Sequence, residues 1–149
     1  RNTVLYLVDG LFGGGAIETK VPVKYFMAPF NNDWCSSIFV SQDQVALESV
    51  CYDFLRTEWN GVNQHNPANG QPDNAPSIRG VDDYLHQAAD SSNWPEGITY
   101  DPDNSGKPLP GLGVHEHWNN AYLKQYSGNL GFKKGIELVA IPDTLVRNK

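Results

Sequence analysis

The chain has 149 residues, of which 40% are hydrophobic, and its net charge is −6. This length and apolar content suffice for one folded domain and exclude a fully disordered chain. The 11 Lys and Arg residues are scattered, and no apolar run reaches the ~20 residues of a membrane-spanning helix. We therefore expect a single domain over residues 1–149 that binds no nucleic acid and does not span a membrane.

The first predicted element is a strand at residues 3–8, with the sequence TVLYLV. A continuous apolar run is typical of a strand buried on both faces, as in parallel or mixed sheets covered by helices. Asp9 follows at the strand's carboxyl end, where ligands usually bind in such sheets. Because the chain starts at Arg1 and enters a strand at once, we expect a fragment or processed part of a longer protein.

The longest periodic pattern lies at residues 41–59 (SQDQVALESVCYDFLRTEW) and predicts a helix. Two starts are open: a capping box of Ser41 with Gln44, or a cap at Asp43. A short β-prone run at residues 37–40 precedes it, so the unit reads as strand then helix. The predicted core stripe includes Leu47, Val50, Cys51, Phe54, Leu55 and Glu58.

The remaining segments alternate between irregular and regular patterns. Residues 60–79 are rich in Asn and Pro and predict a surface excursion. Residues 80–90 predict a second, shorter helix, and residues 135–141 (GIELVAI) predict a last strand. Together the elements predict an α/β fold with a mixed, largely parallel sheet flanked by helices and with long irregular loops.

Five stretches carry a resemblance to a known family, and they stand in the order YLVDGLFG, SSIFVSQDQVALESVCYDFLRTE, GVDDYLHQAA, LGVHEHWNNAYLKQYSGNLG and GIELVAI. The chain resembles the C-terminal half of exported bacterial members of the domain of unknown function 362 family. The resemblance implies export to the periplasm or the extracellular space, and a missing N-terminal part as one partner. Some relatives carry ferredoxin-type clusters, but two isolated cysteines cannot hold one here.

The strongest chemical candidates are His115, Glu116 and His117. In an extended segment, residues two apart point the same way, so both imidazoles can face one divalent metal while Glu116 points away. Asp9 is our first candidate for a third ligand. The alternative is structural: the two histidines and Trp118 would form a hydrogen-bonded plug that holds a loop against the sheet.

Asp101 and Asp103 begin a weaker candidate, because the sequence DPDNSG has the start of a calcium loop. The twelfth position would be Leu112, where calcium loops need a Glu. An Asp-rich turn held by its own side-chain-to-backbone hydrogen bonds is the alternative.

Two cysteines, Cys35 and Cys51, flank the strand-to-helix unit. Export, which the resemblance implies, favours a disulfide, whereas small buried thiols in a core need none. Both states, bridged and free, remain open from the sequence.

Two functions follow from these patterns. One is a binding module that recognises an extracellular partner or a glycan through aromatic residues such as Trp94 and Trp59. The other is a metal-assisted hydrolase or related enzyme that uses His115 and His117.

Overall fold

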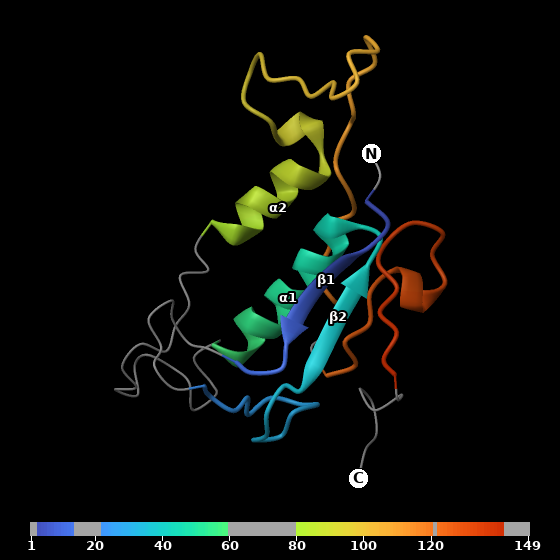
Figure 1. The fold of residues 1–149 in the computed structure, drawn as a ribbon. Coiled ribbons are helices and arrows are strands. Elements are labelled where there is room, and N and C mark those ends of the chain that lie inside the picture. The colour runs from blue at the N-terminus through green and yellow to red at the C-terminus, as the bar shows by residue number, and fades with distance from the viewer. Residues whose placement is uncertain (1–2, 14–21, 60–79, 121, 142–149) are drawn as a thin grey trace.

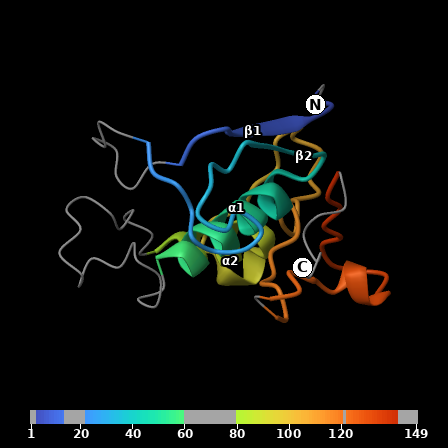
Figure 2. The same cartoon turned by 90° about the horizontal axis from the view of Figure 1, so that it is seen from below.

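The computed structural model describes residues 3–13, 22–59, 80–120 and 122–141. Its elements are β1 (Tyr6–Gly10), β2 (Ser37–Ser41), α1 (Gln44–Glu58), α2 (Val81–Ala89) and two short 3-10 helices, η2 (Ser91–Asn93) and η3 (Gly128–Leu130). The strands form one sheet that packs on α1, and α2 packs on the opposite side of α1 (Figures 1 and 2). Helix α1 is therefore the middle of three layers.

Helix α1 begins where Asp43 caps it. The Asp43 backbone is extended, and its carboxylate accepts the amide hydrogens of Val45 and Ala46 at 2.9 and 3.0 Å. These bonds satisfy two of the free amides of the first turn. The structure thus selects Asp43 over the capping box, and Ser41 ends β2 instead of joining the helix.

The core is built on the stripe of α1. Val50 and Phe54 are 5% and 4% exposed, and the Phe54 ring meets Trp118 edge-on at 5.1 Å between centroids. Leu55 is only partly buried at the margin of this cluster. The prediction that Val50 and Phe54 pack into the main core is confirmed, because an apolar helical stripe must be covered.

At the other end of α1, Glu58 is fully buried and accepts the amide hydrogens of Phe26 and Met27 at 2.8 and 3.0 Å. A carboxylate in this position ties the loop before β2 to the last turn of the helix. The core cluster is completed by Tyr25, Met27, Cys35, Ala46, Trp59, Tyr126 and Ile136.

The predicted fold class is wrong in its sheet. The described residues contain one two-stranded sheet, and its strands are antiparallel, with Tyr6 opposite Ser41 and Gly10 opposite Ser37. Leu7 and Val40 face outward and are 61% and 54% exposed. The apolar run at residues 3–8 suggested cover on both faces, but no described helix lies on the outer one, and periodicity cannot report whether an apolar face finds a partner.

Residues 135–141 also differ from prediction, since residues 136–140 have no regular secondary structure and join no sheet among the described residues. Their backbone bonds instead to the turn at residues 127–129, as described below. The excursion predicted at residues 60–79 lies outside the described residues. The second helix is confirmed as α2, and Gly80 before it has φ of 83°, a left-handed value that favours glycine.

Cys35 and Cys51 are free thiols and line one cavity of ≈ 220 Å³ between β1 and α1. Of the two states that the sequence left open, the structure has the unbridged one. Within the described ranges, no helix has both the length and the apolarity needed to cross a bilayer.

Candidate metal centre

The cap of α1 also positions the histidine segment. The second carboxylate oxygen of Asp43 accepts the Val114 amide hydrogen at 2.8 Å. Gly113 comes so close that an added Cβ would lie 2.0 Å from the Asp43 Oδ1 atom, so a side chain there would displace the capping carboxylate. The start of α1 and the residue before His115 are thus held by one side chain.

Residues 115–117 alternate as the sequence predicted. The His115 and His117 rings lie on one side, with centroids 4.9 Å apart and planes at 84°. Glu116 points elsewhere: its carboxylate accepts hydrogen bonds from the Ser127 hydroxyl at 2.6 Å and from the Ile136 amide. Glu116 therefore anchors the C-terminal segment and does not join the histidines.

The His115 ring is held by a hydrogen bond to Ser49 of α1. The His115 side chain is 1% exposed, and its Nδ1 lies 2.8 Å from the Ser49 hydroxyl oxygen. That hydroxyl donates its single proton to the Val45 carbonyl at 2.7 Å. In that arrangement Ser49 accepts from His115 Nδ1, and the other ring nitrogen, Nε2, lies 3.2 Å from Asp82 Oδ1.

His117 lies between two carboxylates. Its Nδ1 is 2.8 Å from Asp53 Oδ1, and its Nε2 is 2.9 Å from the same Asp82 oxygen that faces His115. Asp53 is fully buried, and three further groups donate to it: Arg56 Nε at 2.8 Å, the Trp118 amide at 2.9 Å and the Tyr126 hydroxyl at 2.9 Å. Asp53 therefore fixes the orientation of the His117 ring.

Helix α2 completes the group from the other side. Asp82 and His86 are four residues apart and share a helical face. One ligand atom each from Asp82, His86 and His115 lies within 4.8 Å of the others, and the His86 and His115 rings meet edge to face at 4.6 Å. Asp82 and His86 reach solvent, so the group is buried on the side of α1 and open to solvent on the side of α2.

The electrostatics of the group follow from this half-buried position. Burial would raise the pKa of Asp82, but the charge and hydrogen bonding of His117 and the contact with His115 hold it below the usual carboxyl value. Burial lowers the pKa of His115, and the neighbouring His117 and His86 lower it further. An ionised carboxylate thus faces an imidazole that favours its neutral form.

The other predicted ligands lie elsewhere. Asp9 is in β1, in the sheet layer on the far side of α1 from α2, and its carboxylate accepts the Leu11 amide hydrogen at 2.9 Å (Figure 2). Asp101 accepts from the Ser105 and Gly106 amides at 3.1 and 2.7 Å, and Asp103 accepts from the Ser105 amide at 3.2 Å. These bonds match the alternative of an Asp-rich turn.

Four residues of the site were not selected from the sequence: Ser49, Asp53, Asp82 and His86. A signal existed for Asp82 and His86, because acid and imidazole at i and i+4 on a short helix form a side-chain pair. Ser49 and Asp53 gave none, since a Ser or Asp in a helix is ordinarily solvent-facing.

No family model matches the chain, and neither the curated proteins nor the solved structures contain a match to it. The resemblance to the domain of unknown function 362 family, and the export that it implies, therefore stay predictions.

Proposed function

We propose that Asp82, His86 and His115 bind one divalent metal ion of the zinc class, and that the protein uses it for metal-assisted hydrolysis. One observation carries the proposal. One ligand atom each from Asp82, His86 and His115 lies within 4.8 Å of the others, and His115 Nε2 faces Asp82 Oδ1 at 3.2 Å. Nitrogen and oxygen ligand atoms gathered in this way are stabilised by a cation bound among them.

The donor set suits such an ion. Two imidazole nitrogens and one carboxylate leave the fourth position of a tetrahedron open, which is the arrangement of catalytic zinc sites. The Ser49 contact orients the His115 imidazole from behind, as outer partners do in metal sites, and Asp53 orients the neighbouring His117. The exposed His86 side chain can close the remaining distance by rotating about its own bonds.

A metal ion held by Asp82, His86 and His115 would supply a Lewis acid that lowers the pKa of a bound water for attack on an ester or amide. His117 is oriented by Asp53, and its Nε2 lies 2.9 Å from Oδ1 of the proposed ligand Asp82. It is placed to take the proton from that water and to return it to the leaving group.

Calorimetric titration of chelator-treated protein with zinc chloride tests the binding, and we expect one ion per chain. Asp82→Asn and His115→Gln should weaken binding at least tenfold, because each removes a ligand, and Ser49→Ala about tenfold, because it frees the His115 ring. Asp83→Asn is the matched control: it removes the adjacent, exposed carboxylate of α2 and should leave binding unchanged. Equal loss in Asp83→Asn, or no binding by the folded wild type, contradicts the site.

Hydrolysis of p-nitrophenyl esters tests the chemistry separately. We expect activity only with the metal, and we expect His117→Gln to lose most of it while still binding the ion. Metal binding without activity toward esters or amides would retain the site and remove the hydrolase.

The binding-module hypothesis named Trp59 and Trp94 as recognition surfaces. Trp59 is 8% exposed and belongs to the core, and the Trp94 indole donates to the Gln87 carbonyl. Neither ring is displayed as an open platform, so recognition by these two aromatics receives no support from their positions.

A further inference from the structure

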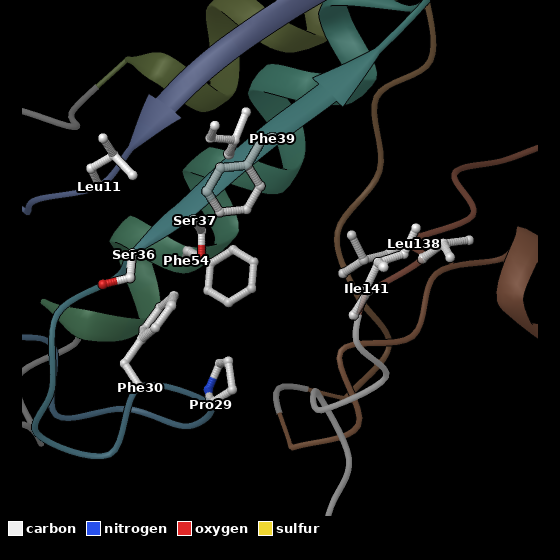
Figure 3. Close-up of a pocket in the computed structure, with 12 residues that line it drawn as sticks. Leu11, Pro29, Phe30, Ser36, Ser37, Phe39, Phe54, Leu138 and Ile141 are labelled. Carbon is white, nitrogen blue, oxygen red and sulfur yellow. The ribbon is translucent and has the colours of Figure 1, made fainter.

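We propose that the groove between β2 and residues 136–141, here called the strand groove, binds one extended strand of a partner polypeptide. Two adjoining cavities of ≈ 440 and ≈ 390 Å³ run along β2. Figure 3 shows Phe39 and Phe54 on one side of the gap, with Leu138 and Ile141 on the other.

One wall of the strand groove is the free edge of β2. Along its whole length, β2 pairs with β1 through one edge only. Among the described residues, no backbone hydrogen bond joins the other edge to residues 136–141. Because alternate residues of a strand direct their N–H and C=O groups to opposite edges, part of the β2 backbone faces the groove unbonded.

The other wall is an extended segment whose backbone is bonded on its far side. Ile136 donates to Glu116 and accepts from the Gly128 amide at 2.9 Å. Leu138 donates to the Asn129 carboxamide at 3.0 Å and accepts from it at 2.9 Å. The backbone N–H and C=O groups of residues 136 and 138 therefore both point away from β2, toward residues 116 and 128–129.

Because backbone groups alternate along an extended segment, the N–H and C=O groups of residues 137 and 139 point the opposite way, toward β2. Within the described ranges, the backbones of Glu137 and Val139 make no hydrogen bond. Two unpaired backbone edges thus lie on either side of an apolar floor. An inserted strand would pair with both, and such strand addition is a recurring mode of peptide recognition.

The walls specify the chemistry of the occupant. A small organic molecule would leave the two backbone edges unused, whereas an extended peptide carries donors and acceptors on both of its edges. Among the residues that line the two cavities, Glu137 is the only charged one, so the segment should be uncharged with apolar side chains toward Phe39 and Phe54. A second copy fits less well, because both described strands are already fixed over α1.

Backbone NMR with a capped Thr-Val-Thr-Val-Thr-Val-Thr peptide tests the proposal. We expect shifts and slower amide exchange in β2 and at residues 137 and 139, and little change around His115. A version of the peptide that is N-methylated at alternate residues loses pairing on one edge and should bind at least tenfold more weakly. Equal binding of both versions, or no binding of either, overturns the proposal.

Val139 offers a matched pair of variants, because its side chain is 67% exposed and its amide is unbonded. Val139→Pro removes one donor from the groove and should weaken peptide binding about fivefold, while Val139→Ala keeps the donor and should not. Equal effects of the two variants contradict strand pairing. Concentration-dependent dimerisation that the peptide does not reverse would show that a second copy fills the groove.

Discussion

The two sides of helix α1 are covered by different kinds of groups, as the surroundings of Asp53 and Phe54 show. Asp53 is covered by polar groups from distant segments, which satisfy its carboxylate from His117, Trp118 and Tyr126. Phe54 is also buried, but it lines the strand groove, where no backbone hydrogen bond among the described residues joins β2 to residues 136–141. The Asp53 carboxylate is satisfied by side chains and one backbone amide, whereas an exposed strand edge carries a row of backbone groups that another extended segment can pair with.

The difference has a consequence for function. The Asp53 side holds His117 in a fixed orientation, because four groups converge on one carboxylate. Such rigid support is what a metal site requires. The Phe54 side leaves apolar surface and backbone groups available, which is what a binding partner requires. The two sides of α1 thus differ: polar groups converge on Asp53 on one side, and apolar side chains line the strand groove on the other.

The largest expected effect is on the apolar side. Phe54→Ala should lower the free energy of unfolding by about 4 kcal/mol, because it leaves a cavity among Phe30, Phe39 and Trp118. Chemical denaturation measures it. Phe132→Ala, at a ring that is 66% exposed, is the control and should change stability little. A small effect at Phe54 would mean that the groove side contributes no core.

Asp53→Asn should cost somewhat less, about 3 kcal/mol, because the amide retains the shape but leaves Arg56 without its charge partner and turns an NH₂ group toward other donors. The same denaturation series measures it against the exposed Asp83→Asn. We also expect the His117 ring resonances to broaden or shift in Asp53→Asn. Unchanged stability and spectra would show that the polar side is not held by this carboxylate.

The smallest effect concerns the two thiols, which lie on the Phe54 side. Burial raises the pKa of Cys35 and of Cys51 to about 11. Only about a thousandth of each thiol is then ionised at pH 8, so alkylation by iodoacetamide should be slow in the folded protein and fast in denaturant. Its rate should rise about tenfold per pH unit up to pH 11.

The same pKa values predict the direction in which the free energy of unfolding changes with pH. An unfolded thiol ionises near 9.0 and the folded one near 11, so the proton is held more tightly in the folded state. Their contribution to stability is complete below pH 9 and declines as the pH rises toward 11. Fewer than two titratable thiols in unfolded, unreduced protein would contradict the free state of both cysteines.

The position of helix α1 and most of its buried face could be predicted from the local sequence pattern. The stripe of Val50 and Phe54 and the polar start at Asp43 are properties of neighbouring residues, so the position of α1 and its buried face followed from the sequence. The shared direction of His115 and His117 followed in the same way, because alternation in an extended segment is local.

Tertiary structure alone decided which groups meet. Asp82 joined the histidines, and Asp9 did not, because α2 and β1 lie on opposite sides of α1, and no local pattern encodes the layer to which a segment is assigned. The sheet failed as a prediction for the same reason: residues 3–8 and 135–141 have strand composition, but pairing depends on a partner distant in sequence. Periodicity reports which face is apolar, and only the packed chain shows what covers it.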